Sequence, residues 1–354
     1  MKQWVIPSLL FVFGALSVVT LLSIAPEFAA KQLVFFLVSG AVFWALHRFS
    51  FKRFEEMSIL GYGGLISSLI LVLLVAGGTR NTSRWIQVGD LFSIQPSQFA
   101  IPIAGLAVAH FISQNSLRSP KSTLKLLLLL FLPAVLIMIA PDLGSTILFL
   151  ATVGSLILFS DIPKKYIAGL VIGGMVVTVF SWFFVLQPYQ KARITSFASP
   201  EDSSDGNYHV EQALIAVGSG ELSGRGLGQG VQSYLRFLPE RQTDFIFASL
   251  AEEYGFIGGV FVLSLYALLI GYILYTGATT SNLTAQLYCY CIATALLIQM
   301  GVNIGMNMGL VPVTGITLPL LSYGGSSILS ILISLAIIQS IIKMQKPQVK
   351  LHLS

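Results

Sequence analysis

The long apolar runs are the feature that most constrains what this chain can fold into. A helix that crosses a bilayer needs about 20 consecutive, mostly apolar residues. About ten such runs occur, near residues 4–25, 30–47, 57–77, 97–113, 124–140, 143–160, 166–187, 255–277, 284–306 and 325–343. Only 10% of the residues are charged, too few to cover a water-soluble globule. We therefore predict an all-α integral membrane protein of about ten transmembrane helices, forming a single polytopic domain over residues 1–354.

Two of these apolar runs have more than one interpretation. The first run, Trp4 to Ala25, resembles the core of a signal peptide but lacks a small-residue cleavage site, so we predict a retained helix. The run from Leu124 to Ser160 is too long for one span and is interrupted by Pro141-Asp142. Because proline breaks helices and aspartate caps them, we predict a sharp turn there between two helices.

Lysine and arginine are concentrated in one set of short connections, which marks the cytoplasmic side. This set comprises Lys2, Arg48, Lys52, Arg53, Arg118, Lys121, Lys125, Lys164, Lys165, Lys343, Lys346 and Lys350. Both termini are therefore predicted to be cytoplasmic. The long loop between the seventh and eighth helices, about residues 187–254, is then extracytoplasmic.

A loop of this length is usually functional or disordered. Residues 200–207 are polar and are predicted to be mobile, whereas Tyr208–Val217 and Phe245–Tyr254 are apolar enough for helices. Several glycines lie between these two segments, from Gly218 to Gly230. We predict a folded cap on the outer face of the membrane.

Two aspartates are candidates for chemistry. Asp244, after Thr243, is either the N-cap of the following helix or a general base at the membrane boundary. Asp142 has an equally strong interpretation as a cap, but an ionisable group among apolar spans is also a candidate functional residue. Glu252 and Glu253 either pair with a cation such as Arg241 or face water.

Other motifs have two interpretations each. The stretch Gly218–Gly230 matches neither a P-loop nor a dinucleotide-binding fingerprint, so it is a tight loop or a set of amides that approach a pyrophosphate. Lys191, Arg193 and Arg84 are either membrane anchors or ligands of an anionic lipid headgroup. The proline- and glycine-rich residues 309–327 fit a re-entrant loop that lines a cavity.

Several function classes lack support. There is no His-Glu-x-x-His motif, no nucleophile elbow and no pair of aspartates two residues apart, so no metal ligand set is assigned. Cys289 and Cys291 lie too close along one helix to face each other and are interpreted as packing residues. The net charge is +5, but the sequence contains no dense run of basic residues. Nucleic-acid binding is therefore not predicted.

Taken together, the motifs resemble those of the SEDS family (shape, elongation, division and sporulation proteins), the peptidoglycan polymerases. The resemblance extends from about Thr82 to Lys343. Its segments are Ser83-Arg84-Trp85-Ile86, Gln95-Pro96-Ser97, Pro141-Asp142-Leu143-Gly144, Arg193-Ile194 with Phe197, Gly218-Ser219-Gly220, Gly226-Leu227-Gly228, Pro239-Glu240, Thr243-Asp244-Phe245-Ile246-Phe247, Glu252-Glu253, Pro312-Val313-Thr314-Gly315 and Ser322-Tyr323-Gly324-Gly325-Ser326-Ser327.

The details favour one branch of that family. Gly230-Val231-Gln232-Ser233 before Pro239-Glu240-Arg241 is more similar to the rod-shape (RodA) branch than to the division (FtsW) branch. The chain also departs from the family pattern. Gln98 stands where a glutamate is usual, Ile101 where a lysine is usual, Glu221 in place of glycine and Gln242 in place of histidine. We assign no catalytic role to Gln98.

The resemblance implies a reaction and a site. One molecule of lipid II, a lipid-linked disaccharide-pentapeptide, would give its sugar to a second and leave undecaprenyl diphosphate, in the inner (cytoplasmic) membrane. Asp244 would be the base for the acceptor hydroxyl, and Lys191 and Arg193 would contact the departing diphosphate. Further substrate-binding candidates are Arg84, Asp142, Glu240 and Ser322.

The same resemblance implies a partner, a class B penicillin-binding protein that cross-links the nascent glycan. It leaves room for a divalent metal, Mg²⁺ or Mn²⁺, for which the sequence shows no ligands. Two other function classes remain open. A lipid II flippase would place ionisable groups along a central path, and a non-catalytic scaffold would tolerate loss of Asp244.

Overall fold

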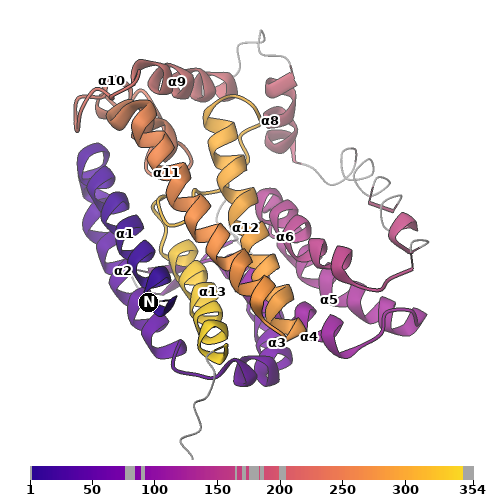
Figure 1. Cartoon of the computed structure of the whole chain (residues 1–354). Helices are drawn as coiled ribbons and strands as arrows, with labels where there is room; N and C mark the ends of the chain where they lie inside the picture. The colour runs from indigo at the N-terminus through magenta and orange to yellow at the C-terminus, as the bar shows by residue number, and fades with distance from the viewer. Residues whose placement is uncertain are drawn as a thin grey trace, which may run out of the picture.

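The computed structural model describes residues 2–75, 84–88, 92–163, 166–169, 173–174, 183, 187–198 and 205–345. Long helices run side by side through the body of the molecule, and shorter helices lie across one end of them (Figure 1). Within the described ranges, eight helices are long and apolar enough to cross a membrane. The molecule is therefore a helical multi-pass membrane protein, as the apolar runs predict.

The helices of the body follow the predicted spans closely. They are α1 (Val5–Ile24, after the short η1, Lys2–Trp4), α2 (Pro26–Leu46), α3 (Phe51–Val75), α4 (Ala100–Gln114, after η2, Pro96–Phe99), α5 (Pro120–Ile139), α6 (Leu143–Gly154, continued by η3, Ser155–Phe159), α11 (Ile246–Thr279), α12 (Leu283–Asn307) and α13 (Gly325–Met344). The predicted span at 166–187 lies almost entirely outside the described residues.

Helix α13 lies at the centre of the bundle. It is the most buried of the spans and packs against α2, while α11 packs against α12 and α4 lies between α12 and α3. Leu335, Ile338 and Ile341 of α13 are inaccessible to solvent. By contrast, α1 and α3 expose large apolar side chains such as Phe11 and Leu74, as expected of surfaces that face lipid.

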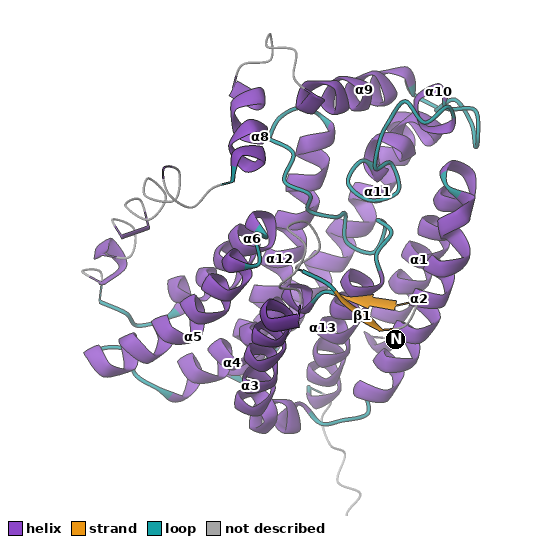
Figure 2. Ribbon diagram, turned by 180° about the vertical axis from the view of Figure 1, so that it is seen from behind, coloured by secondary structure: helices purple, strands orange, loops and turns teal. Residues whose placement is uncertain are grey.

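A small β-hairpin departs from the all-α prediction. Strands β1 (Ile86–Val88) and β2 (Phe92–Ile94) pair antiparallel between α3 and α4, with Ile86 opposite Ile94 (Figure 2). Three-residue strands are too short to be recognised from an apolar pattern. The hairpin matters because Arg84 and Gln95 lie at its two ends.

The cap over the predicted outer end consists of α8 (Pro188–Ala198), α9 (Asp205–Ser219), the short α10 (Val231–Tyr234) and the first turns of α11. Helix α9 confirms the prediction at 208–217, and α11 confirms the one at 245–254. The predicted mobile segment 200–207 is described only from Asp205, where α9 begins; residues 200–204 lie outside the described residues.

The two ends of the bundle differ in character. At the predicted cytoplasmic end, Lys343 Nζ donates to the carbonyl of His47 at 2.9 Å and Asn282 donates to Glu55 at 3.1 Å. At the other end, the irregular segment between α12 and α13 joins the cap, where the Tyr323 amide donates to the carbonyl of Gln242 at 2.8 Å. The predicted site residues gather at this second end.

Candidate functional site

Asp244 lies in the short loop that connects α10 to α11. The loop is closed by its own backbone, since the amides of Thr243 and Phe245 donate to the carbonyl of Glu240 at 3.0 and 3.2 Å. The interpretation of Asp244 as a helix cap is wrong. Phe245 occupies the N-cap position of α11, and no side chain there accepts a capping hydrogen bond. The Asp244 carboxyl group is therefore available for another role.

The surroundings of Asp244 favour proton transfer near neutral pH. The side chain is half-buried. Desolvation and the nearby negative charge of Glu240 raise the pKa of Asp244 to about 6, although the positive charge of Arg193 opposes this increase. A carboxylate with such a pKa is a stronger base than an ordinary aspartate and is still ionised at neutral pH.

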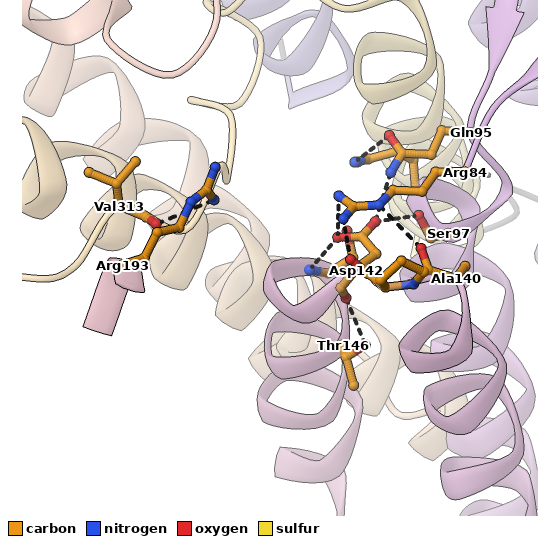
Figure 3. Close-up of polar contacts among 11 residues, drawn as sticks. Arg84, Gln95, Ser97, Ala140, Asp142, Thr146, Arg193 and Val313 are labelled. Carbon is orange, nitrogen blue, oxygen red and sulfur yellow. Dashed lines mark hydrogen bonds and ion pairs between the residues drawn. The ribbon is translucent and has the colours of Figure 1, made fainter. Parts of the chain in front are cut away.

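Arg193 and Asp244 approach the same glycine. Arg193 comes from α8, and its Nη1 donates to the carbonyl of Val313 at 3.5 Å (Figure 3). A Cβ atom added at Gly315 would lie 3.7 Å from Arg193 Nη1 and also 3.7 Å from Asp244 Oδ2. Gly315 has φ +75°, which disfavours any other residue. A Cβ atom there would make ordinary van der Waals contact with both groups, so Gly315 lies between the cation and the candidate base.

A second polar cluster surrounds Asp142, where the predicted cap is confirmed. Asp142 Oδ1 accepts from the Ser145 amide at 3.2 Å at the start of α6. Its other oxygen, Oδ2, accepts from Gln95 Nε2 at 2.8 Å and from Ser97 Oγ at 3.2 Å (Figure 3). Arg84 Nη1 lies 3.8 Å from Oδ1. Asp142 is thus both a cap and the centre of a hydrogen-bond network.

The guanidinium of Arg84 is held in place by main-chain groups as well. Its Nε donates to the carbonyl of Ala140 at 3.2 Å, and its Nη2 donates to the carbonyl of Pro141. Gln98, at the position where the family usually has glutamate, lies beside this network, with Nε2 3.5 Å from Gln95 Oε1. The cation is therefore fixed at the turn between α5 and α6.

One cavity lies between the Asp142 cluster and Arg193, and Asp244 is not among the residues that line it. The cavity has a volume of about 130 Å³ and contains Arg84 and Asp142 on one side and Arg193 and Gln190 on the other. Pro312 to Thr314, from the irregular segment before α13, complete its lining. Figure 3 shows the Arg84–Asp142 cluster and Arg193 on separate parts of the molecule, and both line the cavity. Two arginines on opposite walls suit an anionic group between them.

The remaining candidates take different positions. Lys191 is half-buried on α8, two residues before Arg193, and is not among the residues that line the cavity. Glu240 is exposed and accepts from Thr243 Oγ1 at 3.0 Å. Ser322 is buried behind the loop of Asp244: its hydroxyl donates to the carbonyl of Thr243 at 2.6 Å and accepts from the Leu318 amide at 2.8 Å. That geometry supports the loop.

Both interpretations of Glu252 and Glu253 are wrong. The two side chains are buried and accept hydrogen bonds from the glycine-rich loop and from α10 rather than pairing with Arg241, which donates to the carbonyl of Ile24 instead. Glu252 accepts from the amides of Gln232 and Ser233 at 2.8 and 3.0 Å. Gln232 and Ser233 belong to α10, and within the glycine-rich stretch the Gly228 amide donates to the Glu253 carboxylate at 2.9 Å. The amides of Arg225 and Gly226 donate to the carbonyls of Glu252 and Glu253. Because these amides have partners within the protein, the structure favours the tight-loop interpretation over a pyrophosphate site.

Sequence reasoning missed two residues at the site. Asn303 and Asn307, near the outer end of α12, are fully buried and donate to the carbonyl of Asp244 at 3.0 Å each. Two asparagines one turn apart in an apolar span were the available signal, because amides in that environment need specific partners.

Among the described residues, no group of three or more His, Cys, Asp and Glu side chains could hold a metal ion. In the loop of the candidate base, the two carboxylates that lie near each other are those of Glu240 and Asp244.

Comparisons with known proteins agree with this picture. The model of the FtsW/RodA/SpoVE family, described as "Cell cycle protein", matches residues 2–347. Peptidoglycan glycosyltransferase MrdB of Escherichia coli (strain K12) is 38% identical over 282 residues, which cover 78% of this chain and 76% of MrdB.

Two solved structures have the same fold. A chain from a peptidoglycan synthase complex, described under "structural coordination of polymerization and crosslinking", superimposes with a TM-score of 0.81 at 27% identity, covering 96% of this chain and 97% of that one. The rod shape determining protein RodA of Thermus thermophilus gives a TM-score of 0.72 at 25% identity, covering 97% of each chain. From the family match over nearly its whole length, this chain belongs to the FtsW/RodA/SpoVE (SEDS) family, in its RodA-like branch.

Proposed function

We propose that this chain is a peptidoglycan glycosyltransferase of cell elongation that polymerises lipid II into glycan strands and releases undecaprenyl diphosphate. The relative MrdB carries the name of that activity. The observation that supports it most directly is the placement of a carboxylate with a pKa of about 6 beside a cation-lined cavity at the outer end of the bundle.

The reaction needs one proton acceptor and a group that receives negative charge. Asp244 removes the proton from the acceptor sugar's hydroxyl as that oxygen attacks the anomeric carbon of the donor. The bond between this carbon and the diphosphate oxygen breaks, and the diphosphate leaves with the electron pair. Arg193 and Arg84 stabilise the developing charge from the two walls of the cavity. Lys191 adds positive charge on the same helix as Arg193.

No step of this mechanism passes through a metal. Among the described residues, Asp244 and Glu240 alone supply too few ligands for a protein-held divalent ion. A Mg²⁺ or Mn²⁺ ion, if one takes part, would therefore be carried chiefly by the diphosphate of the substrate.

Location and partner follow from the same reasoning. The protein is a multi-pass membrane protein with bacterial relatives, and we place it in the inner membrane with both termini in the cytoplasm. The similar chain from a peptidoglycan synthase complex supports assembly with a class B penicillin-binding protein. Such a partner would cross-link the strands that this chain makes.

The arrangement of charge favours a transferase over a flippase. Among the described residues, the buried carboxylates are Asp142, Glu252 and Glu253. They lie at the end of the bundle that carries the cap, where they contact the residues of the candidate site or of the glycine-rich stretch. A flippase would need ionisable groups along a path between the two membrane surfaces. A non-catalytic scaffold gives no reason for a carboxylate with a raised pKa beside an anion-binding cavity.

The decisive experiment is Asp244→Asn, assayed with purified protein, its penicillin-binding protein partner and labelled lipid II. The variant keeps size but cannot accept a proton, so glycan synthesis should fall at least about 100-fold while lipid II binding persists. Glu211→Gln is the matched control, because Glu211 is an exposed carboxylate on the same cap. Glycan synthesis at the wild-type rate by folded Asp244→Asn would refute the assignment.

A further inference from the structure

The candidate site is built from segments that are distant in the sequence, and α12 touches two of them. Asn303 Nδ2 donates to the carbonyl of Asp244 at 3.0 Å and to the carbonyl of Ile316 at 2.8 Å. Its side chain is inaccessible to solvent, so both bonds form in a dry environment. One amide group therefore ties the loop of the candidate base to the irregular segment before α13.

Those two segments form opposite sides of the space around the base. Ile316 follows Gly315, whose empty Cβ position is 3.7 Å from both Asp244 Oδ2 and Arg193 Nη1. The same segment accepts the hydrogen bond of Arg193 at Val313. Fixing Ile316 relative to Asp244 thus fixes the base relative to the cation that contacts the leaving group.

Asn307 completes the arrangement one turn later. Its Nδ2 also donates to the Asp244 carbonyl, at 3.0 Å, while its Oδ1 accepts from the Ala248 amide at 2.9 Å in the first turn of α11. The carbonyl of Asp244 is therefore held from two sides. Among uncharged side chains, only asparagine and glutamine carry an NH₂ group that can donate two hydrogen bonds from one nitrogen. The asparagine side chain is the shorter of the two.

We infer that Asn303 is a positioning residue for glycosyl transfer: through its two hydrogen bonds it sets the distance between Asp244 and the Arg193 side of the site. This inference rests on the proposed function. The role of Asn303 differs from a purely structural one, because other contacts hold the neighbouring residues of the loop. Ser322 binds the carbonyl of Thr243, and the Tyr323 amide binds that of Gln242.

The test is a double-mutant cycle in the lipid II polymerisation assay, with kcat and KM measured separately for Asn303→Leu, Asp244→Asn and the double variant. Asn303→Leu should lower kcat on the order of 100-fold, because small displacements of a catalytic group have effects of that size, with KM changed less than about threefold. The double variant should be no slower than Asp244→Asn alone, since Asn303 acts through Asp244.

Two further variants keep the result interpretable. Asn303→Ser retains one donor and should lose less kcat than Asn303→Leu, and it serves if the leucine variant does not fold. Gln299→Leu is the matched control: Gln299 lies one turn earlier on α12 and lines a separate cavity with Gln98 and Ser330. It should keep kcat within about twofold.

Each failure has its own signature. Wild-type kcat in folded Asn303→Leu, or losses that multiply in the double variant, would overturn the positioning role while leaving Asp244 as base. An equal loss in Gln299→Leu would mean that the helix is merely sensitive to substitution. An active Asp244→Asn protein would instead remove the proposed base, whatever Asn303 does.

Discussion

At the scale of single residues, the chemistry of the site depends on the burial of Asp244 and on the two charged side chains near it. Burial and the charge of Glu240 act in the same direction on its proton, and Arg193 acts against them. A fully solvated aspartate would be ionised but weakly basic, whereas a fully buried one would stay protonated. The half-buried position of Asp244 lies between these limits.

The pH dependence of kcat/KM follows from this pKa, because kcat/KM reports the ionisation of the free enzyme. Since the base must be ionised, kcat/KM should be constant above about pH 7 and should fall about tenfold per pH unit below the pKa of about 6. The raised pKa also disfavours the folded state at neutral pH and above, and this penalty disappears as the pH falls below the unfolded value. Asp244→Asn should therefore be at least as stable as the wild type at neutral pH. A rate profile that is flat down to pH 4 would contradict this prediction.

The two cations of α8 should contribute unequally. Arg193→Ala should reduce polymerisation on the order of 10-fold or more, because a charge-assisted contact contributes roughly 1.5–3 kcal/mol. Lys191→Ala should have a smaller effect, since Lys191 does not line the cavity. The measurement is the initial rate of glycan formation by folded protein. Wild-type activity of a well-folded Arg193→Ala protein would return Arg193 to the role of a membrane anchor.

At the scale of elements, the break in α11 explains the glycine-rich loop. Gly255 has φ +66° and interrupts the helix, which frees carbonyls before it and amides after it. The loop supplies partners for both. The amides of Arg225 and Gly226 donate to the carbonyls of Glu252 and Glu253 at 2.9 and 3.0 Å, and the Phe256 amide donates to the carbonyl of Glu221 at 2.9 Å.

This close approach of two backbones accounts for glycine in the loop. A Cβ atom at Gly220 would lie 2.0 Å from the carbonyl oxygen of Ala251, and one at Gly224 would lie 2.1 Å from that of Glu253. A Cβ atom at Gly230 would lie 2.6 Å from the carboxyl carbon of Glu252. The cap is therefore joined to α11 by main-chain hydrogen bonds that larger residues would prevent.

Glu252→Gln tests this joint. The carboxylate accepts from two amides and from Ser233 Oγ at 2.6 Å, whereas a glutamine would direct its NH₂ group at one of these donors. We expect a loss of about 1.5–3 kcal/mol in the free energy of unfolding, seen as a lower melting temperature in detergent. The control is Glu221→Gln, an exposed acid of the same loop whose main-chain amide and carbonyl make hydrogen bonds that do not depend on the carboxylate. Identical melting of Glu252→Gln and wild type would show that the joint is unimportant.

At the scale of the whole molecule, the candidate chemistry lies at one end of a lipid-facing bundle. The turn at Pro141, the cap and the segment before α13 converge there. At the other end, the Ser116 hydroxyl donates to Asp161 Oδ2 at 3.1 Å. A substrate with a long lipid tail fits this layout, because its headgroup reaches the outer end while the tail remains in the bilayer.

Cysteine labelling tests the orientation. Both native cysteines are buried, so a membrane-impermeant maleimide reports on introduced ones. Leu227→Cys, an exposed position in the glycine-rich loop, should be labelled in cells whose inner membrane is intact. Ser119→Cys, exposed at the start of α5, should be labelled only after permeabilisation. Labelling of both positions from the same side would contradict the predicted topology.

Much of the fold could be predicted from the sequence because its determinants are local. The length of an apolar run sets whether a segment spans the bilayer, and each predicted span outside 166–187 coincides with a helix in the described part of the chain. The cap of α6 was also predictable, since Asp142 and the amide it accepts from are three residues apart. The same local rule failed at Asp244, where the chain starts the helix one residue later.

What only the tertiary structure decided is how segments far apart in the sequence meet. From the sequence, the carboxylates of Glu252 and Glu253 were predicted to face solvent or to form ion pairs. In the structure they accept hydrogen bonds from main-chain amides of the glycine-rich stretch and of α10. The approach of Arg193 to Gly315 and the double hydrogen bond of Asn303 depend on how α8, α12 and the segment before α13 pack. The sequence by itself determined the membrane spans and the residue types of the site. Their distances, burial and pKa values come from packing, because these depend on neighbours in space.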